Sequence, residues 1–291
     1  MIVSVAQYFP SIDYLFQVLE KAVNAVEPGG FIFLGDIRSL PLLKAFHASV
    51  QFYRAPETFS KETLQQRVQK QLFEEKQLVI DPAFFTALKQ HLPKISHVDI
   101  LLERGCSQNE LTKFRYDVIL HVDDKPVPTA EIPWLDWNKE GLTLSSVRRI
   151  LEETAPQFLG LTGVPNARTM VDFQLVQWLA NDELPETVGE MKQLLSYIED
   201  RGIEPEVFWA LEKDFPYSVQ ISCSGIGAGD RYDVIFKRST PNAARCFCLP
   251  AAVPPSSRSW HDYANTPWQG NLARERVPQI RNFLREKLPE N

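Results

Sequence analysis

The sequence predicts an α/β protein built on a doubly wound sheet, and three observations carry this prediction. The segment 2–6 is short, apolar and rich in β-branched residues, which is typical of a buried strand in a parallel sheet. The segment 12–26 places apolar residues three and four apart, after Ser11, a residue type that caps helices. A second apolar run at 31–34 follows a Pro-Gly-Gly turn, so strand, helix, turn and strand succeed one another.

Periodicity and turn residues predict the elements of the remaining chain. Helices are expected at 40–53, 59–76 (a charged insertion), 82–91, 142–151, 171–180, 188–200 and 272–288. Strands are expected at 98–103, 114–122, 217–222 and 232–237. The last two read as paired strands around the glycine-rich loop 225–229, which lacks the Lys-Ser/Thr pair of a phosphate-binding loop. We detect no internal repeat.

The composition divides the chain into three parts. Three prolines fall within eight residues after position 125, so we place a boundary there and expect a small α+β unit over 126–250. A second linker rich in proline and serine opens the last part, 251–291, which ends in the final helix. The first part, 1–125, holds the doubly wound sheet.

Charge and hydropathy exclude several classes of protein. A net charge of −6 with scattered Lys and Arg argues against a nucleic-acid partner, because phosphate binding needs a concentrated basic face. No apolar run is long enough to span a membrane and no signal peptide is evident, so we expect a cytoplasmic protein with no membrane partner. The four cysteines are too few and too scattered for a disulfide framework, and we expect no metal site.

The residues that follow the first two strands are candidate site residues. Ligands of open α/β sheets bind beyond the carboxyl ends of the strands, which selects Gln7, Tyr8, Asp36 and Arg38. Tyr8 can shape a slot for an amine, Asp36 can orient it, and Arg38 can reach a carboxylate or carbonyl. The alternatives are structural: Tyr8 packs on the next helix, and Asp36 caps a helix or pairs with Arg38 at the surface.

A third candidate segment precedes the strand at 114–122. Asn109 and Glu110 place an amide and a carboxyl group in a loop that can face the same cleft. Alternatively, both residues belong to a hairpin turn.

Three separated stretches resemble motifs of the N-methyltransferase domains embedded in nonribosomal peptide synthetases. They are Ser-Val-Ala-Gln-Tyr-Phe-Pro at 4–10, Gly-Asp-Ile-Arg-Ser at 35–39 and Asn-Glu-Leu-Thr-Lys-Phe-Arg-Tyr at 109–116. The last is the most specific, because that family has Asn-Glu-Leu-Ser-x-Tyr-Arg-Tyr there. Stretches at 163–168, 232–236 and 263–290 resemble the tail after such domains and the adenylation-domain segment that follows. The nearest type is the cyanobacterial microcystin synthetase, which would imply toxin biosynthesis.

The resemblance implies a fold and a reaction. Residues 1–125 would be the carboxyl-terminal half of a class I, Rossmann-like methyltransferase sheet. The reaction would transfer a methyl group from S-adenosylmethionine to the amino nitrogen of a carrier-protein-bound aminoacyl thioester. Tyr8, Asp36 and Arg38 would be catalytic, whereas Gln7, Asn109 and Glu110 would bind the substrate. The other partners would be the remainder of the methyltransferase and adenylation domains.

The sequence lacks the glycine-rich loop that holds the cofactor in this fold. We therefore expect a fragment that binds S-adenosylmethionine poorly by itself, with cofactor-binding residues that we cannot assign. A half sheet also exposes an unpaired strand edge, which predicts self-association. The alternative is a non-catalytic scaffold or docking module derived from such a domain.

Overall fold

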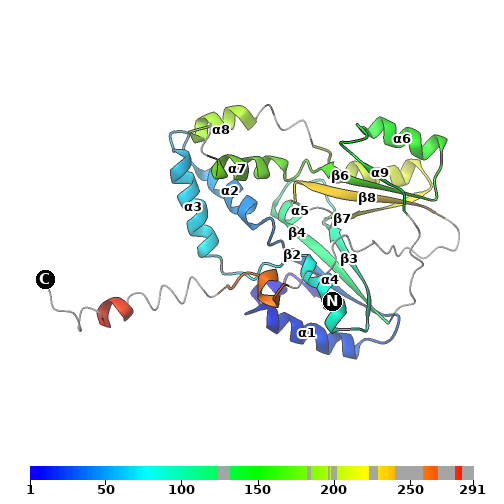
Figure 1. The fold of residues 1–291 in the computed structure, drawn as a ribbon, viewed down its shortest axis with the longest axis horizontal. Helices are drawn as coiled ribbons and strands as arrows, with labels where there is room; N and C mark the ends of the chain where they lie inside the picture. The colour runs from blue at the N-terminus through cyan, green and yellow to red at the C-terminus, as the bar shows by residue number, and fades with distance from the viewer. Residues whose placement is uncertain are drawn as a thin grey trace.

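The computed structural model describes residues 1–123, 132–181, 185–195, 197, 202–222, 229–239, 258–267 and 279–283, which form two four-stranded sheets with helices around them (Figure 1). The elements in chain order are β1 (Ile2–Val3), the 3₁₀ helix η1 (Ala6–Tyr8), α1 (Ile12–Ala25), β2 (Phe31–Arg38), α2 (Leu43–Arg54), α3 (Lys61–Phe73), α4 (Ala83–His91), β3 (Ile95–Leu102), α5 (Glu110–Phe114), β4 (Arg115–Val122), β5 (Trp134–Asp136), α6 (Leu144–Glu153), β6 (Phe158–Pro165), α7 (Met170–Ala180), α8 (Val188–Leu195), α9 (Pro205–Asp214), β7 (Tyr217–Ser222), β8 (Arg231–Arg238) and the 3₁₀ helix η3 (Trp260–Tyr263). The predicted α/β class is therefore confirmed.

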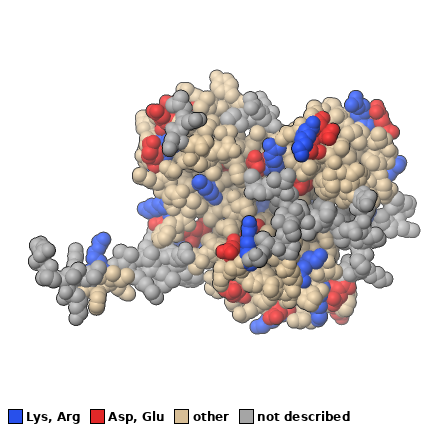
Figure 2. All heavy atoms as spheres, viewed as in Figure 1, with Lys and Arg blue, Asp and Glu red and all other residues tan. Residues whose placement is uncertain are grey.

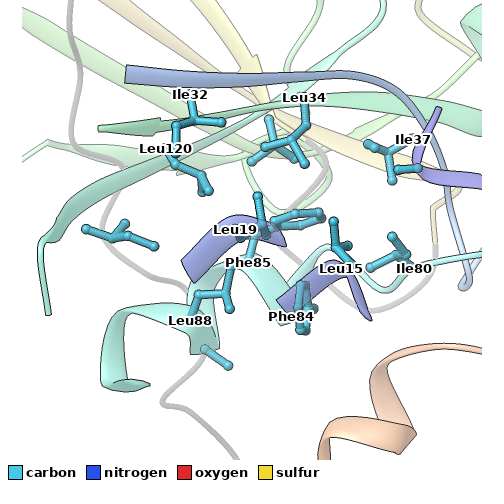
Figure 3. Packing of buried hydrophobic residues seen from close by; sticks show 14 of the residues in the cluster. Leu15, Leu19, Ile32, Leu34, Ile37, Ile80, Phe84, Phe85, Leu88 and Leu120 are labelled. Atoms are coloured by element: carbon cyan, nitrogen blue, oxygen red, sulfur yellow. The ribbon is translucent and has the colours of Figure 1, made fainter. Parts of the chain in front are cut away.

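The first sheet has the order β1-β2-β4-β3 and is mixed. β1 pairs with β2 in parallel, and β4 lies between β2 and β3 and is antiparallel to both. One face is covered by α1 and α4, which bury Leu15, Leu19, Phe84 and Phe85 completely (Figure 3). Helix α1 begins where the sequence predicts, because the Ser11 hydroxyl accepts a hydrogen bond from the backbone N–H of Tyr14.

The second sheet repeats the first in its strand order and helix placement. Its order is β5-β6-β8-β7, with β5 parallel to β6 and β8 antiparallel to both of its neighbours. Helices α6 and α9 pack on one face of it, as α1 and α4 do on the first sheet. The expectation that the chain contains no internal repeat is therefore wrong. The repeat is hard to detect in the sequence because the two copies share their topology more than their residues.

Two short stretches of sequence still match between the copies. Both copies begin their last strand with Arg-Tyr-Asp-Val-Ile, at 115–119 and at 231–235. The segments 80–93 and 203–216 both lead through a proline into a helix on the sheet face. Their identical pairs are Ile80 and Ile203, Pro82 and Pro205, Phe85 and Phe208, Ala87 and Ala210, Leu88 and Leu211, and Pro93 and Pro216.

A shared backbone irregularity strengthens the match. β2 and β6 each contain a bulge at the same register, where Asp36 and Gly163 have φ of 65° and 72°. The N–H of Asp36 donates to Asp117 Oδ1 at 2.9 Å, and the N–H of Gly163 donates to Asp233 Oδ1 at 3.1 Å. Such a bulge with the same side-chain partner is a structural feature of both copies.

The two copies meet through equivalent elements. α2 contacts α7, and β3 lies against β7, so each contact joins an element to its own counterpart. This is the arrangement of an interface around an approximate twofold axis. Helices α2 and α3 from one copy and α7 and α8 from the other share a hydrophobic core, which includes Leu64, Leu175 and Met191.

The segment 258–267 returns to the first sheet. Trp260 lies in η3 with its ring centroid 4.7 Å from His91, 5.2 Å from Phe84 and 5.5 Å from Phe16. The side chain of Asn265 accepts from the N–H of Val79 and donates to a backbone carbonyl nearby. This part of the chain therefore completes the first core.

Substituting Trp260 by alanine is expected to lower the free energy of unfolding by about 2 kcal/mol, because the half-buried indole ring covers α1 and α4. Urea unfolding of the chain measures this change. Tyr53→Ala is the matched control, since that ring is 89% exposed and its loss is expected to leave the midpoint almost unchanged. Equal midpoints for both variants would show that the returning segment contributes nothing to the fold.

Most predicted elements are confirmed within about three residues. The strand predicted at 2–6 ends at Val3, because Ser4 has a φ of 54° and the chain turns into η1. The strand predicted at 31–34 continues to Arg38 through the bulge, so Asp36 lies inside it rather than after it. β5, β6 and α9 were not predicted, and neither was α5, which begins where the sequence predicts a loop or a hairpin turn at 109–110.

Several expectations fall outside the described residues. They concern the proline-rich linker at 126–131, the loop at 223–228, the second linker at 251–257 and most of the helix predicted at 272–288, of which 279–283 is helical. The edge strand β1 leaves Val3 40% exposed, and self-association through this edge stays a prediction.

Candidate active site

The candidate site lies at one edge of the first sheet. β1, β2 and β3 run in the same direction, and β4 runs against them, so three carboxyl ends and the amino end of β4 share this edge. Ligands of open α/β sheets bind at such an edge. Most of the predicted site residues lie there, on segments that follow these strands or precede β4.

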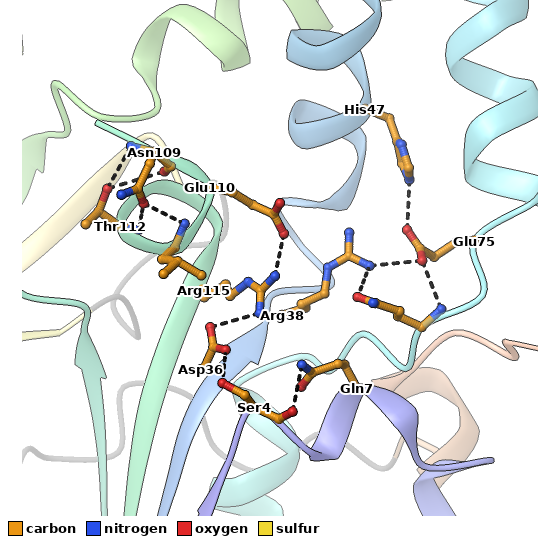
Figure 4. A network of polar contacts seen from close by, with 12 residues as sticks. Ser4, Gln7, Asp36, Arg38, His47, Glu75, Asn109, Glu110, Thr112 and Arg115 are labelled. Atoms are coloured by element: carbon orange, nitrogen blue, oxygen red, sulfur yellow. Dashed lines mark hydrogen bonds and ion pairs between the residues drawn. The ribbon is translucent and has the colours of Figure 1, made fainter. Parts of the chain in front are cut away.

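A chain of polar contacts crosses the edge from β1 to α5 (Figure 4). The Ser4 hydroxyl donates to Asp36 Oδ2 at 2.5 Å, and Arg115 Nη1 donates to Asp36 Oδ1 at 2.9 Å. The second guanidinium nitrogen of Arg115 donates to Glu110 Oε1 at 2.6 Å. Asp36 therefore pairs with Arg115, and neither predicted alternative for Asp36, a helix cap or a pair with Arg38, is what the structure shows.

Glu103 adds a third carboxyl group, which was not among the residues predicted from the sequence. It follows β3 as Tyr8 follows β1, whereas Asp36 lies within β2, near its carboxyl end. Burial, the neighbouring carboxyl of Asp117 and the charge of Asp36 raise the pKa of Glu103 to about 7. The rule that selected the residues after the first two strands, applied to the strand at 98–103, would have found it.

Asp117 shares this environment. It lies on β4, where it accepts the backbone N–H of Asp36, and burial raises the pKa of its carboxyl as well. Two carboxyl groups that interact this closely favour a state in which one proton is held between them. The site therefore offers a group that can release or accept a proton near neutral pH.

Gln7 and Tyr8 differ in exposure although they are neighbours in η1. Gln7 is 5% exposed and its Nε2 donates to the carbonyl of Ser4 at 3.0 Å, whereas its Oε1 is buried with no hydrogen-bond partner among the described residues. Tyr8 is 71% exposed, so the alternative in which it packs on the next helix does not hold. Phe9 fills that role instead, with its ring 5.0 Å from that of Tyr14.

The side chain of Arg38 points into the protein interior. Its Nη1 lies 2.9 Å from Glu75 Oε1 and 3.1 Å from Gln77 Oε1, and its guanidinium carbon lies 5.0 Å from the ring centroid of Phe46. His47 contacts the other carboxylate oxygen of Glu75 at 3.1 Å. Burial opposes ionisation of Glu75, but the hydrogen bonds from His47 and Gln77 and the charge of Arg38 lower its pKa to about 2. Arg38 is engaged in this ion pair.

Asn109 and Glu110 have different positions in α5. The Asn109 side chain caps the helix, because its Oδ1 accepts from the N–H groups of Leu111 and Thr112. The Glu110 side chain is 43% exposed and pairs with Arg115. Asn109 thus shapes the loop, and Glu110 contributes charge to the polar chain.

On the face in Figure 2, acidic and basic side chains are interspersed over the described surface. Among the described residues, no group of three or more His, Cys, Asp or Glu side chains is arranged to hold a metal ion. The helices that the structure describes are too short or too polar to cross a membrane.

Comparison with known proteins identifies the relatives of this chain. No protein-family model matches it. Chondramide synthase of Chondromyces crocatus is 41% identical over 291 residues, a match that covers 98% of this chain. The homologues of the present chain are nonribosomal peptide synthetases. Cyclosporin synthetase of Tolypocladium inflatum is 31% identical over 71% of the chain, and a probable non-canonical nonribosomal peptide synthetase of Salinispora arenicola is 31% identical over 99% of it.

The matches cover a small part of each relative. The chain spans 7% of the chondramide synthase, 2% of the cyclosporin synthetase and 3% of the Salinispora protein. The similarity over nearly the whole of this chain supports its predicted origin from a nonribosomal peptide synthetase. The reaction of this particular segment is a separate question.

Proposed function

We propose that this chain forms part of an S-adenosylmethionine-dependent N-methyltransferase domain of a nonribosomal peptide synthetase. The acceptor would be the amino nitrogen of an aminoacyl thioester on a carrier protein. Residues 1–125 would be the carboxyl-terminal half of a class I methyltransferase sheet. The same proposal includes a cytoplasmic location. The product of the synthetase would be a peptide natural product, and more specifically a toxin of the microcystin type.

The observation that carries the proposal is the carboxyl group of Glu103 at the shared strand edge. An amine must be neutral to attack a methyl group, so a nearby base has to accept its proton. A base works best when its pKa lies near the operating pH, and the pKa of Glu103 is about 7. The neighbouring Asp36 and Asp117 make the site suitable for a cationic ammonium group.

The other residues have supporting roles in this proposal. Asp36 is held by Ser4 and Arg115, so its carboxylate has a fixed direction toward the edge. Tyr8 is exposed at the end of β1, where its ring can limit the position of the acceptor. S-adenosylmethionine would supply the methyl group. The excess of carboxyl groups supports a cationic cofactor nearby, as does the buried Oε1 of Gln7, which has no hydrogen-bond partner in the described part of the chain.

The reaction balances with the groups named. When bound, S-adenosylmethionine would supply an electrophilic methyl group to the amine nitrogen and would keep the electron pair of the broken carbon–sulfur bond. The proton of the amine passes to the Glu103 carboxylate. Positioning the two reactants in line contributes much of the rate enhancement in such transfers.

The test uses the synthetase that contains this chain. The purified protein, with its carrier loaded with an amino acid, is incubated with methyl-labelled S-adenosylmethionine, and the bound aminoacyl group is analysed by mass spectrometry. We expect a labelled methyl on the amino nitrogen. An acceptor that stays unmethylated while the carrier is fully loaded would overturn the proposal and favour the scaffold alternative.

A further inference from the structure

The loop between β3 and β4 carries three of the candidate site residues. Glu103, Asn109 and Glu110 all lie between Leu102 and Arg115, on a segment whose first part, 103–109, is neither helix nor strand. Gly105 in this segment has a φ of 146°, a conformation that favours glycine. The position of these side chains therefore depends on what holds the loop.

Arg168, from the second copy of the fold, holds it. Its side chain is 1% exposed and lies just before α7. Nη1 donates to the carbonyl of Glu103 at 2.6 Å and to that of Thr112 at 3.3 Å, and Nη2 donates to the carbonyl of Gly105 at 2.8 Å. Nε donates to Glu204, which balances the buried charge. One guanidinium thus joins the two ends of the loop.

Other side chains of the second copy add to this contact. Glu206 on α9 accepts the backbone N–H of Gly105 at 2.6 Å. The guanidinium of Arg104 lies 4.8 Å from the ring centroid of Trp209, on the same helix. Asp172 on α7 pairs with Lys113 at 2.6 Å. Residues of the second copy between positions 168 and 209 therefore contact the loop at several points along its length.

At the position equivalent to Arg168, the first copy has no arginine. The register of β2 and β6 aligns Arg168 with Pro41, which has no side-chain donor to return the contact. In the same alignment, Gly163 is the counterpart of Asp36, and Pro165 is the counterpart of Arg38. The second copy therefore lacks counterparts of Asp36 and Arg38, although it has those of Arg115 and Asp117, and its Arg168 contacts the loop of the first copy.

We propose that Arg168 is a positioning residue, through which the second copy of the fold sets the geometry of the 103–112 loop in the candidate site. The effect of Arg168 on catalysis rests on the proposed function, whereas its effect on the loop does not. An arginine is required, because a lysine ammonium cannot reach three carbonyls spread over the ends of a loop. Methionine would leave these buried carbonyls without a donor.

The experiment compares Arg168→Met with Arg148→Met in the intact synthetase. Arg148 lies on α6 of the same copy, 48% exposed, and pairs at the surface with Asp214, so it is a matched control. Hydrogen exchange should become faster in the 103–112 loop of R168M, with β3 and β4 unchanged. The kcat of methyl transfer should fall by about 10- to 100-fold, more than KM changes, because the loop is misplaced. The pH–rate profile should also shift, since Glu103 moves relative to Asp117.

Two further arms keep the test decisive. Glu206→Ala removes a single contact to the loop and replaces R168M in the test if R168M does not fold. It should raise the rate of hydrogen exchange at Gly105 alone. Unchanged exchange in the loop of either variant, or a loosened loop with wild-type kcat and pH profile, would overturn the inference. If the wild-type protein transfers no methyl group, the proposed function fails, while the exchange measurement still decides whether Arg168 holds the loop.

Discussion

Replacing Glu103 by glutamine is expected to lower the rate of methyl transfer by about 10²- to 10⁴-fold at neutral pH. Glutamine keeps the size of the side chain and loses the group that accepts the proton. The wild-type rate should rise with pH through a limb near pH 7, where Glu103 ionises, and this limb should be absent in the variant. The measurement is the pH dependence of kcat in the methyl-transfer assay that tests the proposed function.

The stability of this variant separates chemistry from folding. The pKa of Glu103 is higher in the folded chain than in the unfolded chain, so its contribution to stability is present below about pH 4.5 and is lost as the pH rises through about 7. The variant has no charge to bury and should be at least as stable as the wild type at about pH 8. Glu20→Gln, on the exposed face of α1, is the control and should change neither rate nor stability. A fully active E103Q protein would exclude Glu103 as the base.

Replacing Asp99 by asparagine is expected to lower the free energy of unfolding by about 2–4 kcal/mol at neutral pH. Asp99 lies on β3 and is 6% exposed. His97 and His121 each place Nε2 at 2.9 Å from its carboxylate, and Gln220 on β7 donates to it at 3.1 Å. The substitution therefore weakens both the first sheet and its contact with the second.

The pH dependence identifies the cause. Burial opposes ionisation of Asp99, but the hydrogen bonds from His121 and His97 and the charge of His97 lower its pKa to about 2. Its contribution to stability is then present above about pH 4 and is lost as the pH falls through about 2. Urea unfolding at a series of pH values should show the difference between wild type and D99N shrinking in this window. A difference that is constant down to about pH 2 would show that packing, not charge, is responsible.

Asp13→Asn is the control for this series. Its side chain is 54% exposed and its contact with His261 is long, at 3.9 Å, so solvent screens it. We expect its unfolding curve to follow that of the wild type across the whole pH range.

Local patterns predicted the local elements well. The helix at 12–25 follows from the spacing of Leu15 and Leu19 and from its serine cap, and β7 begins and ends at the predicted residues. β6 was missed because its two glycines and final proline are poor strand residues, and it is held instead by pairing with β5 and β8. Helix α9 was missed although a proline at its first position is a known helix start.

The candidate site was predicted in part. The rule that ligands bind after parallel strands selected Asp36 and Tyr8, and the structure places both at the shared edge. It could not reveal that Arg38 turns inward, because the partner Glu75 lies in a distant segment. Glu103 was within reach of the same rule, but its pKa depends on Asp117 and Asp36, which only the folded sheet brings together.

By itself, the sequence determined the α/β class, most element positions and the likeness to peptide synthetases, because periodicity, capping residues and short motifs are properties of neighbouring residues. Only the tertiary structure decided that the chain contains two copies of one fold, since these share a bulge, a register and a strand order but few residues. It also decided that Arg168 of one copy donates hydrogen bonds to the loop after β3 of the other copy. Long-range contacts of this kind are set by packing, which no local pattern encodes.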